Sequence, residues 1–319
     1  MERRNFIKTT ATMAPLLSYF PASLANIYRE KTPDKLEKRS LGKTGEKLSI
    51  IGFGGIVVMD ASPTQAANRV AEAIDYGVNY FDVAPSYGDA EIKLGPALES
   101  YRSKVFLACK TTERSKGESQ KELDQSLKRL RTNYFDLYQL HSVTTLEEVD
   151  IIFGKNGAME TFLKAKKEGK IKHIGFSAHS VEAAMALMDR FDFDTILFPT
   201  NYATWYAGNF GPQVLAKAQE KEMGILALKA MARRPWPEGA ERKYPKAWYE
   251  PLDEPDEAEM GLRFTLSHPV TAAIPPGDES LFKMALGLAA RFKPLSSSEV
   301  KEVKDKGLKE TPLFEYPQT

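Results

Sequence analysis

Short apolar segments alternate with longer amphipathic ones along most of this chain, and this alternation restricts the possible folds more than any other feature. The segments with the length and composition of buried strands are 48–53, 80–83, 105–110, 137–141, 171–177, 195–199, 224–229 and 272–274. They begin about every 25–35 residues, with one longer gap, which is the period of βα units. About eight such units favour a closed (β/α)8 TIM barrel over an open doubly wound sheet.

Amphipathic segments between these strands have the periodicity of helices. We expect helices over 65–76, 119–131, 158–168 and 181–190, with Gly77 ending the first and Ser180 capping the last. An earlier segment, 38–48, has the pattern of a β-hairpin that turns at 43–46. We expect this hairpin to close the floor of the barrel. No linker or low-complexity tract marks a second domain, so residues 26–319 are predicted to form a single domain.

Ionisable side chains stand where three consecutive predicted strands end. Asp82, Lys110 and His141 occupy these positions, and Tyr87 follows Asp82 by five residues in a short loop. In barrels of parallel strands, catalytic residues gather where the strands pass into the following loops. The four residues therefore predict one site.

The chemistry of these four side chains predicts proton transfer. A phenol has an unperturbed pKa of about 10, and a nearby Lys110 ammonium is expected to lower the pKa of Tyr87. Asp82 would balance the charge of Lys110, and His141 would orient a carbonyl oxygen by hydrogen bonding. No side chain here can deliver hydride, so reduction requires a cofactor. The alternative is a structural Asp–Lys pair beside an unrelated histidine.

The first 25 residues have the features of a targeting segment. The run from Arg3-Arg4 to Lys8 resembles the twin-arginine export signal, although Glu2 stands where Ser or Thr is usual. Small residues at Ser23 and Ala25 suit cleavage after Ala25. The segment is too short and polar for a stable membrane anchor. We therefore expect recognition by the twin-arginine export machinery and a periplasmic location; the alternative is a frayed N-terminus on a cytoplasmic protein.

Charge and cysteine content exclude several classes of function. The chain has 44 basic and 43 acidic residues, a formal net charge of +1, so no overall field would attract nucleic acid. The only cysteine, Cys109, rules out an intramolecular disulfide and multi-cysteine metal sites. Because it precedes Lys110 on a strand, Cys109 should point toward the helices as an inert buried thiol. His179 has no second ligand at metal spacing.

An ordered series of motifs resembles one enzyme family, the aldo-keto reductases. The motifs are LGKTG at 41–45, IGFGG at 51–55, DVAPSYG at 82–88, DLYQLH at 136–141, IGFS at 174–177 and IPPG at 274–277. The resemblance covers about residues 39–290. It implies a (β/α)8 barrel that reduces an aldehyde or ketone to an alcohol with NADP or NAD. It also implies that Tyr87 is the proton donor and that Lys110 adjusts the pKa of Tyr87. Asp82 would then be the partner of Lys110, and His141 would orient the substrate carbonyl.

The resemblance implies a cofactor site but with departures from the family pattern. Its residues would be Gly54, Ser177, Asn201, Leu228, Lys229, Pro276, Gly277 and Ser280. Ala178 stands where the family usually has Asn after the serine. Leu197 stands where it often has Gln, and Leu228 where it commonly has an aromatic residue. Asp278 and Glu279 replace the Lys or Arg expected against a 2′-phosphate, which favours NAD or weak binding. Peptide N–H groups after Gly277 could hold a pyrophosphate.

Two long connections follow predicted strands, 142–157 and 230–256, and on this face such loops often form substrate walls. The alternative is a structural flap over the rim of the barrel.

Two other functions also remain open. One is a non-catalytic barrel that binds a nucleotide as a sensor or binds a partner, and its support is the altered nicotinamide pocket. The other is a cofactor-independent isomerase or lyase that uses Tyr87 and Lys110.

Overall fold

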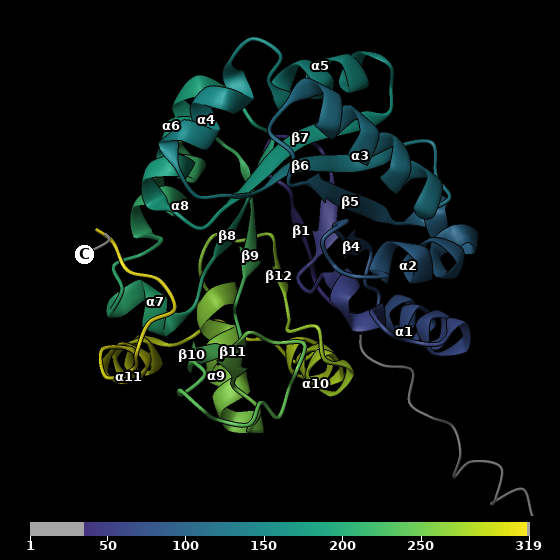
Figure 1. Ribbon diagram of the computed structural model, residues 1–319. Coiled ribbons are helices and arrows are strands. Elements are labelled where there is room, and N and C mark those ends of the chain that lie inside the picture. Colours follow the sequence, from purple (N-terminus) through teal and green to yellow (C-terminus); the bar gives the residue numbers. More distant parts are fainter. Residues whose placement is uncertain (1–34, 318–319) are drawn as a thin grey trace, which may run out of the picture. The chain divides into compact units, whose positions relative to one another are not determined.

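Eight parallel strands form a closed ring at the centre of the computed structural model, which describes residues 35–317 (Figure 1). In order around the ring they are β3 (Phe53–Gly54), β4 (Tyr80–Asp82), β5 (Phe106–Thr111), β6 (Phe135–Val143), β7 (Ile171–Ala178), β8 (Thr195–Pro199), β9 (Gly224–Leu228) and β12 (Ala272–Ile274). A parallel bridge between Ile51 and Ala273 joins the last strand to the start of the first. The predicted (β/α)8 barrel is confirmed.

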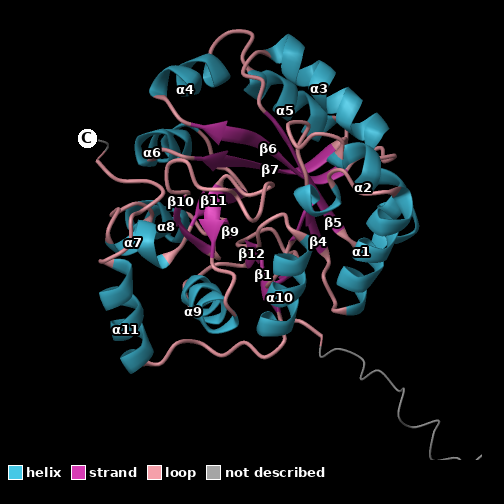
Figure 2. Cartoon of the chain, turned by 60° about the horizontal axis from the view of Figure 1, so that its bottom comes forward, coloured by secondary structure: helices cyan, strands magenta, loops and turns pink. Residues whose placement is uncertain are grey.

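Helices cover the outside of this ring (Figure 2). The helices that follow barrel strands are α1 (Pro63–Asp75), α2 (Ala90–Leu98), α3 (Lys116–Arg129), α5 (Ala158–Lys167), α6 (Val181–Arg190), α8 (Pro212–Glu220), α9 (Pro255–Leu266) and α10 (Glu279–Ala289). Shorter or additional helices are η1 (Gly55–Val58), η2 (Glu99–Lys104), α4 (Leu146–Phe153), α7 (Tyr202–Tyr206) and α11 (Ser297–Gly307). Ser180 caps α6 as expected, accepting a hydrogen bond from the amide of Ala183.

Most predicted boundaries differ from the structure by one to three residues, and two of the differences have a clear physical reason. The segment predicted as α3 begins three residues earlier, at Lys116, because Ser115 accepts a hydrogen bond from the amide of Glu118 and so fixes the N-terminus. The first predicted strand, 48–53, is divided: its start belongs to a hairpin strand and only Phe53 belongs to the barrel strand β3. A continuous apolar run does not show where one strand ends and the next begins.

A hairpin closes the N-terminal end of the barrel, as predicted. Its strands β1 (Lys38–Ser40) and β2 (Lys47–Ser49) pair antiparallel. Leu41 and Leu48 are completely buried and pack with side chains inside the barrel, such as Leu226. Gly42 has a φ of 50°, and an added Cβ there would lie 2.3 Å from the amide nitrogen of Gly224. Only glycine therefore fits where the hairpin meets the start of β9.

The two long connections have different structures. The first contains α4, and the second forms a small antiparallel sheet of β10 (Ala232–Pro235) and β11 (Tyr249–Pro251). The proposed export signal at residues 1–25 lies outside the described residues. Between residues 35 and 317, no helix combines the length and apolar character needed to cross a bilayer.

Substituting Leu48 with alanine is expected to destabilise the fold, because it empties the closed end of the barrel. For a fully buried leucine the expected loss is about 2–5 kcal/mol in the free energy of unfolding. Leu163→Ala is the matched control, since Leu163 is 50% exposed on α5. Urea unfolding followed by circular dichroism measures both variants. Equal, small effects in the two would mean that the hairpin does not stabilise the barrel.

Candidate active site

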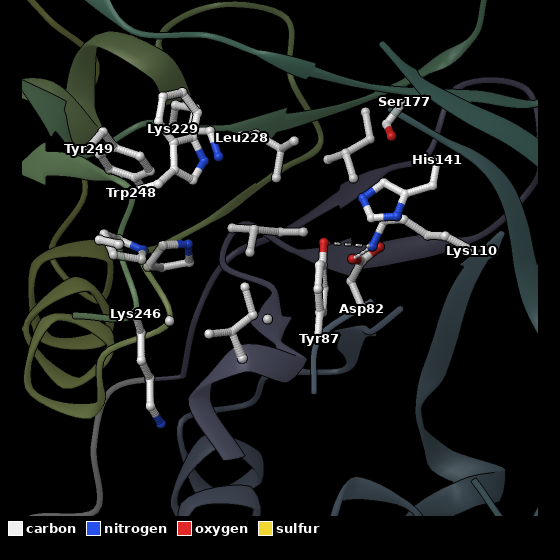
Figure 3. A pocket seen from close by; sticks show the side chains of 18 of the residues that line it. Asp82, Tyr87, Lys110, His141, Ser177, Leu228, Lys229, Lys246, Trp248 and Tyr249 are labelled. Carbon is white, nitrogen blue, oxygen red and sulfur yellow. Dashed lines mark hydrogen bonds and ion pairs between the residues drawn. The ribbon is translucent and has the colours of Figure 1, made fainter. Parts of the chain in front are cut away.

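A cavity of about 190 Å³ opens where the barrel strands end (Figure 3). The cavity is lined by most of the site residues that the sequence predicted: Gly54, Asp82, Tyr87, Lys110, His141, Ser177, Leu228, Lys229, Pro276 and Gly277. Asn201 and Ser280 do not line it. Asn201 caps α7 by accepting a hydrogen bond from the amide of Thr204, and Ser280 lies in a neighbouring groove.

Asp82 and Lys110 form a buried ion pair at the base of the cavity. Both side chains are almost fully excluded from solvent, and the ammonium of Lys110 donates to Oδ1 of Asp82. Burial lowers the pKa of Lys110, but the Asp82 carboxylate outweighs burial and raises that pKa above its ordinary value. Lys110 therefore stays charged at neutral pH.

Two residues that sequence reasoning missed hold the other oxygen of Asp82. Tyr80 Oη and Gln139 Nε2 each donate a hydrogen bond to Asp82 Oδ2 at 3.0 Å. Tyr80 lies two residues before Asp82, and Gln139 lies two residues before His141. Because alternate residues of a strand face the same side, these positions also face the barrel interior. The period-2 pattern could have identified both.

Tyr87 approaches this ion pair with its hydroxyl. Its Oη lies 3.4 Å from Lys110 Nζ, which also lies 3.4 Å from the carbonyl oxygen of Val83. Burial raises the pKa of Tyr87, and Lys110 only partly opposes that rise. The expected net fall in the pKa is therefore wrong, because the loss of hydration outweighs one neighbouring cation. At neutral pH the phenol retains its proton and can donate it.

His141 completes the group as a neutral imidazole. Burial, assisted by the charge of Lys110, lowers the pKa of His141 to about 2. The ring meets that of Tyr87 edge-on, with 5.7 Å between centroids, and Nδ1 lies 3.4 Å from Ser86 Oγ. Arg114 fixes the backbone by donating to the carbonyl oxygen of His141 at 2.7 Å.

Apolar side chains and one hydroxyl of the cavity fit a flat ring that carries a polar amide. Leu197, Leu228 and Ile274 supply apolar surface. Ser177 Oγ accepts a hydrogen bond from the amide of Ser142 at 2.7 Å, so its own hydroxyl hydrogen is available to a ligand. These residues suit a nicotinamide ring and its carboxamide, even though the usual Asn is absent.

Asp278 and Glu279 line the groove beside the cavity. Their surroundings there weaken the expectation that they would repel a 2′-phosphate. Glu279 forms ion pairs with Arg69 and with Lys283, the latter at 3.1 Å. Asp278 accepts hydrogen bonds from the amides of Ser280 and Leu281 at 2.9 and 3.3 Å. The charge of Glu279 is thus balanced by cations, whereas Asp278 has only hydrogen-bond donors, and two of the amides after Gly277 are occupied. The sequence argument considered only adjacent residues and missed cations from other elements.

The second long connection forms one wall of the cavity, through Lys246, Ala247, Trp248 and Tyr249 (Figure 3). Among the described residues, none of 142–157 lines the cavity.

On the outer side of β5, Cys109 is buried with its sulfur 3.6 Å from Glu91 Oε1, and burial raises the pKa of Cys109 well above the ordinary value. The predicted burial of this thiol is confirmed. Residues 35–317 contain no cluster of three or more His, Cys, Asp or Glu suited to a metal ion.

Substituting Tyr80 with phenylalanine removes one of the two hydrogen bonds to Asp82 Oδ2. Because the carboxylate is buried and charged, we expect a loss of about 1–3 kcal/mol in the free energy of unfolding. Tyr202→Phe is the control, since the buried hydroxyl of Tyr202 has no hydrogen-bond partner among the described residues. Denaturant titration compares the two. A loss in Tyr202→Phe as large as in Tyr80→Phe would contradict this account of Asp82.

Known proteins share this sequence and fold. A family model described as "Aldo/keto reductase family" matches residues 50–247. L-galactose dehydrogenase of Arabidopsis thaliana is 28% identical over 214 residues, which cover 62% of this chain and 66% of that protein. Aldo-keto reductase YhdN of Bacillus subtilis is 30% identical over 166 residues, covering 46% and 48%. These matches span about half to two thirds of the curated relatives' lengths.

The fold is also that of a solved structure. Aldo-keto reductase AKR11C1 from Bacillus halodurans, in its holo form, matches with a TM-score of 0.69 and 23% identity. The match covers 89% of this chain and 99% of that one. The family model alone covers more than half of the chain, in the region that contributes Asp82, Lys110 and His141. This chain belongs to the aldo/keto reductase family.

Proposed function

We propose that this protein reduces an aldehyde or a ketone to an alcohol with NADPH or NADH, and that Tyr87 donates the proton. The observation that carries the proposal is the 3.4 Å separation between the Tyr87 hydroxyl and a lysine ammonium that is itself paired with Asp82. Family membership supports the class of reaction. The small cavity supports a small-molecule substrate.

Each of the four residues has a distinct role in this proposal. Neutral His141 donates a hydrogen bond to the carbonyl oxygen and holds it beside Tyr87. Tyr87 transfers its proton to that oxygen as negative charge develops there. The ammonium of Lys110 stabilises the resulting tyrosinate until a proton from solvent restores the phenol. Asp82 keeps Lys110 charged and in position.

The cofactor would lie against the apolar side of the cavity. Gly54, Ser177, Leu228, Pro276 and Gly277 are the residues that would hold it, with the Ser177 hydroxyl directed to the carboxamide. When bound, a reduced nicotinamide supplies the hydride that the carbonyl carbon receives. The cations beside Glu279 leave both NADP and NAD compatible with the neighbouring groove.

Replacing Tyr87 with phenylalanine is expected to lower kcat/KM by about 10²–10⁴-fold, the usual contribution of a general acid. Nucleotide binding should persist, because the ring and the ion pair below it remain. Carbonyl-dependent oxidation of NADPH and NADH measures turnover, and calorimetry measures nucleotide affinity. Tyr76→Phe serves as control, since Tyr76 ends α1 and does not line the cavity. Wild-type turnover in Tyr87→Phe would remove Tyr87 from the mechanism. Tight nucleotide binding without turnover by the wild type would instead favour a sensor.

We further propose that residues 1–25 act as a twin-arginine export signal and that residues 26–319 form the mature domain. The paired Arg3-Arg4 and the small residues before position 26 support this reading. In a bacterium with twin-arginine export, the periplasmic protein should have the intact mass of a chain without residues 1–25. Replacing both arginines with lysine should retain the full-length protein in the cytoplasm. Cytoplasmic, full-length protein in both cases would disprove the signal.

A further inference from the structure

Lys229, which the family resemblance places among the cofactor residues, lines the cavity, and the proposed proton transfer does not use it. It comes directly after β9 and has a φ of 68°, a backbone conformation that disfavours residues other than glycine, asparagine or aspartate. Such conformations recur at ligand-binding positions, where the surrounding structure holds them. The side chain lies at the wall of the cavity formed by Trp248 and Tyr249 (Figure 3).

The ammonium of Lys229 has no acceptor in the described part of the chain. The other lysines of the cavity do: Lys110 is paired with Asp82, and Lys246 donates to the carbonyl oxygen of Met59 at 2.5 Å. Lys229 Nζ instead lies 5.0 Å from the ring centroid of Trp248 and 4.9 Å from that of Tyr249. Aromatic faces stabilise a cation but accept no strong hydrogen bond from it.

The surroundings of Lys229 therefore leave a positive charge uncompensated. Burial lowers its pKa to about 8, and no carboxylate nearby raises it again. At pH 7 the amine is still mostly protonated. An ammonium without a counter-charge, facing a cavity, is complementary to an anionic group of a ligand.

His179 offers a second donor in the same cavity as Lys229. It also lines the cavity, and burial together with the charge of Lys229 lowers its pKa to about 4, so it is neutral at pH 7. Its Nδ1 lies 2.9 Å from Ser142 Oγ, and its Nε2 has no partner among the described residues. When Ser142 donates to Nδ1, Nε2 carries a hydrogen and can donate. Stacking on Phe314, with 5.1 Å between centroids, holds the ring.

We propose that Lys229 and His179 form an anion-binding subsite that recognises a carboxylate on the carbonyl substrate. This inference rests on the proposed carbonyl reduction. Lys229 lies on one side of the cavity, while Tyr87, Lys110 and His141 gather on the other (Figure 3). A short molecule with a carbonyl at one end and a carboxylate at the other would contact both groups. The substrate class is therefore the small oxo acids.

The kinetic test compares 4-oxobutanoate with its neutral methyl ester. The measured quantity is the ratio of kcat/KM for the acid to kcat/KM for the ester. Lys229→Met keeps the length of the side chain and the backbone preference but removes the charge, and it should lower this ratio by about 10- to 100-fold. Lys229→Arg should retain most of the ratio. Lys121→Met is the matched lysine control, because Lys121 is exposed on α3 and does not line the cavity, and it should change the ratio by less than about twofold.

A binding measurement separates this inference from the proposed function. With oxidised nucleotide present, no reduction can occur, and calorimetry gives the affinity of the protein for 4-oxobutanoate and for the ester. The wild type should prefer the acid, and Lys229→Met should lose that preference. This result would support the subsite even if no carbonyl were reduced. Absence of reduction would then count only against the proposed function.

Two outcomes would overturn the subsite. Equal losses for acid and ester in Lys229→Met, together with weaker nucleotide binding, would assign Lys229 to the cofactor's diphosphate instead of a substrate carboxylate. An unchanged preference in Lys229→Met, or an equal loss in Lys121→Met, would show that Lys229 does not recognise the anion. Thermal unfolding checks that Lys229→Met is folded, and Lys229→Gln, which is also uncharged, must reproduce its effect.

Discussion

The ion pair between Asp82 and Lys110 joins two neighbouring strands inside the barrel, where both charges are excluded from water. Removing two charges from water is costly, and removing only one partner typically costs about 3–5 kcal/mol because the other charge is left uncompensated. Tyr80 and Gln139 reduce that cost by donating to the carboxylate. The position of the ammonium then determines the electrostatic environment of Tyr87 and His141.

The two sides of the cavity differ in how firmly their side chains are held. On the proton-transfer side, Asp82 and Lys110 lie at strand ends that neighbouring strands fix, and Tyr87 lies in the short loop after β4. The other side combines the end of β9 with the loop that carries Trp248 and Tyr249. A rigid set of reacting groups facing a loop-built wall is the usual way in which barrels keep one chemistry while varying the substrate. The position of Lys229 on the loop side agrees with a role in substrate selection.

Local sequence patterns were sufficient to predict the barrel, the hairpin and the grouping of Asp82, Tyr87, Lys110 and His141. Strand-end positions follow from apolar runs, and parallel topology brings those ends together, so Asp82, Lys110 and His141 could be grouped without coordinates. The pKa of Tyr87 could not be predicted, because it depends on how far burial exceeds the effect of Lys110. The compensation of Glu279 by Arg69 depends on α1 and α10 being neighbours, which adjacent residues do not reveal. Asn201 shows a third difficulty, since a polar residue just beyond a strand can cap a helix instead of facing the site.

The bridge between Ile51 and Ala273 closes the sheet with few contacts. Gly52 donates to the carbonyl oxygen of Ala273, and the amide of Ala273 donates to the carbonyl oxygen of Ile50, each at 2.9 Å. An open sheet would expose unpaired backbone groups at two edges, and these can recruit strands from other molecules into aggregates. Two hydrogen bonds therefore protect the protein from edge-to-edge polymerisation.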